Sequence, residues 1–140
     1  MKEIYSPGTP QVDGAALEAH VQAVAEQFAQ AGRILIVPPD FTRCYSMAGE
    51  ITKLLYRFFA PRAEVKIIPA LGTHMPMDDR ERLAFFGDIP SDCFLTHRWY
   101  SDTVRLGAIP GSVTAEISGG LYREPIAVEL NNCFRRAALM

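Results

Sequence analysis

The sequence has little cysteine and no long apolar run, and each scarcity excludes a class of protein. Its 3 cysteines, Cys44, Cys93 and Cys133, are odd in number and widely separated, so we expect reduced thiols rather than a disulfide framework or a Cys-x-x-Cys site. No apolar run approaches the roughly 18 residues that a membrane-spanning helix requires. Residues 1–8 lack the apolar core of a signal peptide. These absences together predict a cytoplasmic protein.

The chain also lacks an excess of charge of either sign. Lys and Arg total 14 against 16 for Asp and Glu, a formal net charge of -2, so we expect no nucleic-acid partner and no binding to an anionic membrane. With 49% hydrophobic and 21% charged residues, the composition is that of a globular protein. The length of 140 residues predicts one domain spanning 1–140.

Helix and strand patterns alternate over the first two thirds of the chain. The predicted order is helix 13–32, strand 33–37, helix 46–60, strand 64–68, helix 79–86 and strand 93–96. Asp13 is the expected N-cap of the first helix and Gly32 its C′ residue. This order is typical of βαβ units, and right-handed crossovers would place helices on both faces of a mainly parallel sheet. We therefore predict an α/β, three-layer Rossmann-like domain.

The last third has a different pattern. Residues 103–106, 112–118 and 124–129 have the composition of strands, and Gly119-Gly120 between the last two is typical of a hairpin turn. We therefore expect a β-rich C-terminal tail.

Two segments that follow predicted strands carry the side chains best suited to chemistry. The first, 38–44, contains Asp40, Thr42 and Arg43, and the second, 69–76, contains Gly72, Thr73 and His74. Ligands of open α/β sheets bind beyond the carboxyl ends of the strands, so these segments are expected to share one site. Arg43 could then bind a carboxylate or phosphate in two parallel hydrogen bonds, and His74 could exchange a proton with a bound hydroxyl.

Each of these side chains also has a purely structural interpretation. Asp40 could cap a turn by accepting a hydrogen bond from the backbone two residues on. Arg43 could be a solvated surface charge, and His74 a structural loop residue. The other histidines, His20 and His97, are interpreted as structural, and no histidine pair has the spacing of metal ligands, so we assign no metal ligand in this chain.

The run Asp40-Phe41-Thr42-Arg43, followed by Leu71-Gly72-Thr73-His74-Met75-Pro76, resembles the paired signature of the lactate racemase family's N-terminal domain. The similarity extends over roughly residues 30–132. Members of this family interconvert the stereoisomers of 2-hydroxy acids with a nickel-pincer nucleotide, a pyridinium mononucleotide that carries nickel.

The resemblance implies roles for six residues. His74 matches an acid/base histidine that takes the proton of the substrate hydroxyl while the C2 hydrogen moves as hydride to the cofactor. Arg43 matches the ligand of the substrate carboxylate. The matches to the cofactor contacts are Asp40, Thr42, Gly72 and Thr73.

The chain departs from the family by its length. Family members are longer, and the lysine that holds the cofactor covalently, the nickel-binding histidine and the second acid/base histidine come from a later segment that this chain does not contain. We therefore expect an incomplete enzyme that is inactive alone and whose partner is a missing C-terminal domain or a second copy.

Two alternatives remain open. A non-catalytic, truncated domain would bind a small anion or a partner chain, which would cover the apolar end at 131–140. A hydrolase using Cys44 as nucleophile is a third interpretation, although no base adjoins that cysteine in the sequence.

Overall fold

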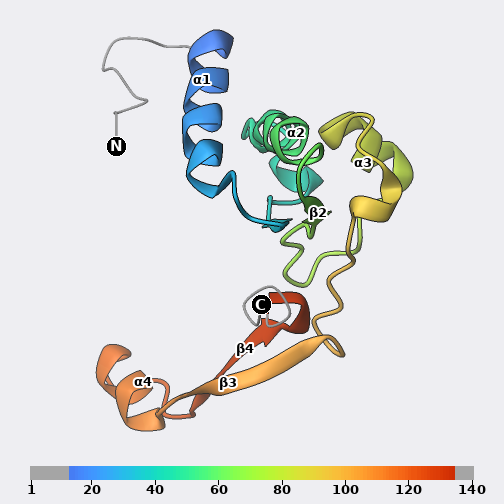
Figure 1. Cartoon of the computed structure of the whole chain (residues 1–140). Helices are drawn as coiled ribbons and strands as arrows, with labels where there is room; N and C mark the ends of the chain where they lie inside the picture. Colours follow the sequence, from blue (N-terminus) through green and yellow to red (C-terminus); the bar gives the residue numbers. More distant parts are fainter. Residues whose placement is uncertain (1–12, 135–140) are drawn as a thin grey trace. The chain divides into compact units, whose positions relative to one another are not determined.

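The computed structural model describes residues 13–134, which form two compact units (Figure 1). The first unit ends at Thr96 and the second begins at His97. Residues 1–8, considered above for a signal peptide, and the apolar end at 135–140 lie outside the described residues. Between residues 13 and 134, no helix is long and apolar enough to cross a membrane.

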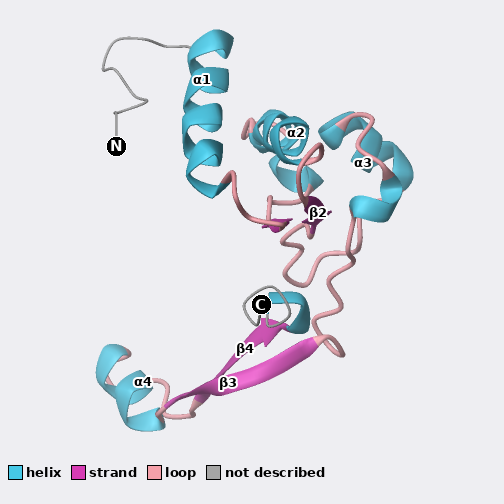
Figure 2. Cartoon of the chain, viewed as in Figure 1, coloured by secondary structure: helices cyan, strands magenta, loops and turns pink. Residues whose placement is uncertain are grey.

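The first unit alternates helices and strands, as the sequence predicts (Figure 2). In chain order it contains α1 (Gly14–Ala25), the 3-10 turn η1 (Glu26–Phe28), β1 (Arg33–Ile36), the 3-10 turn η2 (Phe41–Arg43), α2 (Ala48–Phe59), β2 (Glu64–Ile67), α3 (Asp79–Phe86) and the 3-10 turn η3 (Ser91–Cys93). Strands β1 and β2 pair in parallel, with Ile36 opposite Ile67. The predicted α/β class is thus confirmed as a mixed helix and strand structure with a small parallel sheet.

The observed helix ends can be compared with the capping residues that the sequence predicts. Helix α3 has the predicted bounds, and its capping box is formed: the Glu81 N–H donates to Asp78 Oδ1 at 2.8 Å, and the Asp78 N–H donates to Glu81 Oε2 at 3.1 Å. Helix α1 begins after Asp13 as predicted but ends well before Gly32, which is wrong as its C′ residue. The reason is that the chain tightens into η1, where the Ala29 N–H donates to the Glu26 carbonyl three residues back at 3.2 Å.

The core of the first unit lies where α2 and α3 pack together beside the parallel sheet. Its buried residues are Ala25, Ile36, Phe59, Val65, Ile67, Phe85, Phe86 and Ile89. Gly49 of α2 allows the close approach, because a Cβ atom there would lie 2.2 Å from the backbone oxygen of Phe85 in α3. The contact depends on glycine for space, not for an unusual backbone conformation.

Replacing Gly49 with alanine should therefore destabilise the first unit despite the higher helix propensity of alanine. The added methyl would force α2 away from α3, and overpacking of this kind costs about 1–3 kcal/mol. Chemical denaturation followed by far-ultraviolet circular dichroism measures this loss. The matched control is Gly14→Ala in α1, where a Cβ meets nothing within 4 Å and no loss is expected. Equal stability of the two variants would contradict the packing argument.

The predicted third strand at 93–96 is wrong as a full strand. The chain makes the turn η3 and then forms one parallel bridge to β2, between Ile67 and Phe94, in which the Leu95 N–H donates to the Ile67 carbonyl at 2.7 Å. The segment runs in the predicted direction beside β2, but one bridge does not make a ladder.

The second unit contains β3 (Thr103–Ile109), α4 (Gly111–Ile117) and β4 (Ile126–Asn131). The predicted strand at 112–118 is wrong, because this segment is α4, and the predicted hairpin at Gly119-Gly120 is wrong with it. These two glycines have φ of +63° and +86° and end the helix, where the Gly120 N–H donates to the Ala115 carbonyl at 2.7 Å. Strand β3 pairs with β4 in antiparallel fashion instead.

The β3–β4 ribbon has one apolar face. Across the two strands, Val104 stands opposite Leu130, Gly107 opposite Val128 and Ile109 opposite Ile126, with one bulged residue between Arg105 and Gly107. Ile126, Val128 and Leu130 are 45%, 39% and 38% exposed. Within the described residues, this face of the ribbon is therefore open to solvent.

Candidate functional site

The parallel pairing of β1 and β2 brings the two candidate segments to the same edge of the sheet. Beyond the strands, Pro39 and Ala70 form a further parallel bridge, and the Ala70 N–H donates to the Pro38 carbonyl at 2.8 Å. Residues 40–44 and 71–76 both leave the sheet directly after this bridge. Their expected proximity is confirmed.

Asp40 is the buried centre of this site. Its side chain is 6% exposed, and it caps η2: Oδ1 accepts a hydrogen bond from the Thr42 backbone N–H at 3.1 Å and another from the Thr42 hydroxyl. Its other oxygen, Oδ2, lies 2.7 Å from Nδ1 of His74. The turn-capping interpretation of Asp40 is therefore correct, and the same carboxylate also binds the histidine.

The hydrogen bonds around Asp40 control its ionisation. Burial raises the pKa of the Asp40 carboxyl, but the hydrogen bonds from Thr42 and His74 favour the charged form and together outweigh burial, so the pKa lies below its ordinary value. Asp40 is thus an anion at neutral pH.

His74 stands at the end of a tight turn and is more than half exposed, at 57% of its side chain. Its backbone N–H donates to the carbonyl of buried Leu71 at 2.9 Å, which closes the turn. Gly72 within the turn has φ of +58°, a conformation that glycine adopts without steric cost. The turn therefore holds the imidazole between a buried anion and solvent.

Phe41 anchors the other half of the site. Its half-buried ring packs edge-on against Phe85 of α3, with centroids 6.1 Å apart and the planes at 88°. Since Phe41 directly follows Asp40, this contact with the core holds η2, and with it the carboxylate, in place.

The remaining predicted site residues are exposed. Arg43 ends η2, and Gly72 and Thr73 lie in the His74 turn. Within residues 13–134, the Arg43 guanidinium makes no hydrogen bond or ion pair. Its donors are free to bind an anion.

The other two histidines lie away from this site. His20 Nδ1 is 2.6 Å from the Ala16 carbonyl within α1, and His97 is held by Asn131 in the second unit. All three cysteines are free, as expected for reduced thiols. In the part of the chain that the structure describes, no three His, Cys, Asp or Glu side chains are grouped as metal ligands, and Cys44 has no hydrogen bond to a base.

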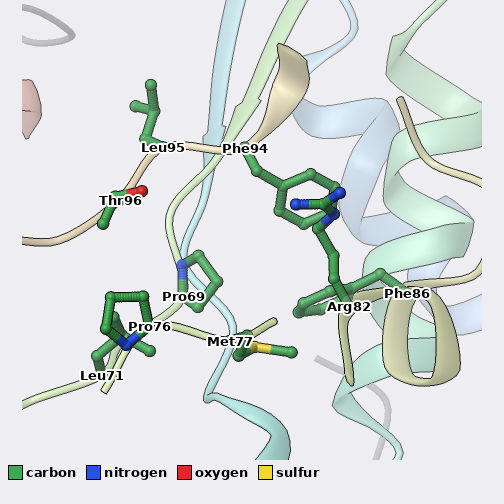
Figure 3. Close-up of a pocket in the computed structure, with 9 residues that line it drawn as sticks. All are labelled: Pro69, Leu71, Pro76, Met77, Arg82, Phe86, Phe94, Leu95 and Thr96. Carbon is green, nitrogen blue, oxygen red and sulfur yellow. The ribbon is translucent and has the colours of Figure 1, made fainter. Parts of the chain in front are cut away.

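A small pocket beside the site was not predicted from the sequence (Figure 3). It is lined by Pro69, Leu71, Pro76, Met77, Arg82, Phe86, Phe94, Leu95 and Thr96. The Arg82 guanidinium lies over the Phe94 ring at 5.4 Å from its centroid and pairs with Asp79 at 3.0 Å. The pocket is mainly apolar, with one cation in its wall.

The Asp40–His74 hydrogen bond was also missed, although its signal is present in the sequence. Aligning the ends of the two predicted parallel strands places residues 40 and 74 at one edge. The pairing of a carboxylate with an imidazole follows only once the turn at Gly72 directs His74 back toward Asp40.

Comparison with known proteins gives a family and a fold. A family model described as lactate racemase N-terminal domain matches residues 11–119. A crystal structure of a Thermotoga maritima protein is similar to this chain with a TM-score of 0.76 and 24% sequence identity, covering 92% of this chain. The chain spans only 32% of that protein's length. No protein of curated function matches the chain.

Proposed function

The chain belongs to the family of lactate racemase N-terminal domains, and on that premise we propose that it is the substrate-binding part of an isomerase that interconverts the stereoisomers of a 2-hydroxy acid. The observation that carries the proposal is the exposed His74 imidazole hydrogen-bonded to buried Asp40 at 2.7 Å. A histidine of this kind can take and return the proton of a substrate hydroxyl, because the nearby anion stabilises the imidazolium that forms.

Arg43 would bind the carboxylate of the same substrate. A 2-hydroxy acid carries its carboxylate on the carbon next to the hydroxyl, so it requires a cation near the base. The exposed Arg43 guanidinium, three residues after Asp40, offers two parallel donors for this purpose.

The cofactor that the family implies fits this chain only in part. Within residues 13–134 no ligand set could hold nickel, so we derive no step through the metal. When bound in the whole enzyme, the nickel-pincer nucleotide would supply a hydride acceptor. We assign the binding of its nucleotide to Thr42, Gly72 and Thr73, whose exposed positions at the same edge support this role.

The whole protein would add what this chain lacks. We infer that the two-stranded sheet is part of a larger sheet in a three-layer, Rossmann-like domain of a cytoplasmic enzyme. A further domain of that enzyme would supply the covalent lysine and the nickel ligand. The length of the similar solved structure, of which this chain spans 32%, supports that view. The chain alone is then expected to bind substrate without turnover.

The test is a titration of the isolated chain with each stereoisomer of lactate. The NMR signals of His74 report binding. We expect lactate to shift these signals, and Arg43→Ala to weaken binding about 10- to 100-fold, the value of a charge-assisted hydrogen bond pair. The matched control is Arg57→Ala, which removes an exposed arginine of α2. This variant should bind lactate with unchanged affinity. Absence of any shift at His74, or equal loss in both variants, would refute the proposal.

The alternative of a binding domain without catalysis draws on the β3–β4 ribbon. Its open apolar face, with Ile126 at 45% and Val128 at 39% exposed, is a surface that another chain or domain could cover. Light scattering distinguishes the two: a self-associating chain whose His74 does not respond to lactate would favour this alternative.

A further inference from the structure

Both carboxylate oxygens of buried Asp40 already accept hydrogen bonds from this chain. Oδ1 is occupied by the backbone N–H and hydroxyl of Thr42, and Oδ2 by His74 Nδ1. We propose that Asp40 is a positioning residue, which holds His74 in the tautomer that has its proton on Nδ1 and its lone pair on Nε2. The catalytic consequence rests on the proposed function above; the tautomer itself does not.

The assignment follows from donor and acceptor chemistry. An ionised carboxylate can only accept hydrogen bonds, so the group 2.7 Å from Asp40 Oδ2 must be the donor, which places the proton of a neutral imidazole on Nδ1. Nε2 then carries the lone pair. Among the described residues Nε2 has no hydrogen-bond partner, and the ring is 57% exposed, so this lone pair is available to a ligand.

Both partners of the hydrogen bond are held from the core. Thr42 donates twice to Oδ1 and so prevents rotation of the carboxylate, while the edge-on contact of Phe41 with Phe85 fixes the turn that carries it. On the other side, buried Leu71 and the backbone hydrogen bond at 2.9 Å hold the histidine turn. The imidazole is thereby oriented before a ligand arrives.

The other two histidines provide internal references. His20 Nδ1 lies 2.6 Å from a backbone carbonyl, which can only accept, so His20 also carries its proton on Nδ1. His97 has the opposite tautomer: the Cys133 N–H donates to Asn131 Oδ1 at 2.9 Å, which leaves the Asn131 amide group to donate to His97 Nδ1. His97 therefore carries its proton on Nε2.

The experiment is a two-bond proton–nitrogen correlation spectrum of the chain labelled with ¹⁵N-histidine, recorded at about pH 9, where ordinary imidazoles are neutral. With 3 histidines in the sequence, single His→Gln variants assign every signal. We expect Nδ1–H for His20 and His74 and Nε2–H for His97. Nε2–H at His74 in the unaltered chain would overturn the proposal.

The decisive variant is Asp40→Asn. Its amide oxygen can still accept from Thr42 and cap η2, but its NH₂ group would donate to His74 Nδ1 and move the ring proton to Nε2. The matched control is Asp13→Asn, which changes another capping carboxylate; among the described residues it accepts from a backbone N–H, that of Ala15, at 3.1 Å and makes no other hydrogen bond. Unchanged signals of His20 and His97 would show that both variants are folded.

We expect the His74 tautomer to reverse in Asp40→Asn and to stay the same in Asp13→Asn. Retention of Nδ1–H at His74 in the folded Asp40→Asn chain would overturn the proposal. If the tautomers are as expected but lactate does not bind, the proposed function fails and the positioning role of Asp40 stands. In a complete isomerase, a histidine held in this reversed tautomer should lower the rate of proton transfer by about 10⁴-fold.

Discussion

Replacing Phe86 with alanine is expected to lower the free energy of unfolding of the first unit by about 3–5 kcal/mol. The Phe86 side chain is fully buried at 0% exposure. Its ring centroid lies 4.7 Å from the ring centroid of Phe85 and 5.2 Å from that of Phe94. The variant would leave a cavity among rings that come from α3 and from the segment bridged to β2. A loss of this size is a large part of the stability of an ordinary domain.

The measurement must report on the first unit. Trp99, the single tryptophan, belongs to the second unit, so its fluorescence is unsuitable; far-ultraviolet circular dichroism with urea, or amide hydrogen exchange in α2 and α3, is the better observable. Phe28→Ala is the matched control, because that ring is 56% exposed and its removal should cost less than about 1 kcal/mol. Similar losses in the two variants would show that the core is not centred on Phe86.

Replacing Asp40 with alanine should destabilise the first unit in a manner that depends on pH. At neutral pH the variant loses hydrogen bonds to a charged group, a loss of about 1.5–3 kcal/mol. Because the folded protein lowers the pKa of Asp40 below the ordinary value of 3.8, the unfolded chain binds the proton more readily. The stability that Asp40 contributes is therefore complete above about pH 3.8 and is lost as the pH falls through the folded pKa.

Urea titrations of the unaltered chain and of Asp40→Ala, from neutral pH downward, measure this difference. We expect the two chains to differ most at neutral pH and to converge in acid. Asp13→Ala, which removes a cap without a histidine partner, should cost about 1 kcal/mol at neutral pH. A difference for Asp40→Ala that is constant or grows in acid would contradict the ionised Asp40 pairing.

The predictions from sequence succeeded where local signals determine the structure. Helix α3 has the predicted bounds because Asp78 and Glu81 form a capping box and Gly87 ends the helix. Strands β1 and β2 were predicted within one residue, since short runs of β-branched residues between turns leave few alternatives.

The failures lie where distant contacts decide. Residues 112–118 contain Val113, Thr114 and Ile117, whose β-branched side chains favour a strand, yet the segment is helical. Thr114 is buried, and its hydroxyl lies 3.0 Å from the carbonyl of Glu124, ten residues away. That contact overrides the weak local preference, and no local pattern could have shown it.

The site was predicted in position but not in its hydrogen bonding. The order of strands and loops was enough to place Asp40 and His74 at one edge. That Asp40 meets the imidazole depends on a turn that places Asp40 inside and Arg43 in solvent, and this turn is anchored by Phe41 against Phe85.

The register of β1 against β2 has a consequence for how the site assembles. Asp40 and His74 are 34 residues apart in sequence and meet only because Pro39 lies opposite Ala70. Closing such a long loop costs chain entropy that local contacts do not repay, so the hydrogen bond can form only after α2 has crossed over and the strands have paired. The ring proton of His74 is therefore a reporter of folding: a chain that refolds with a shifted strand would contain all its helices and lack the Asp40–His74 hydrogen bond.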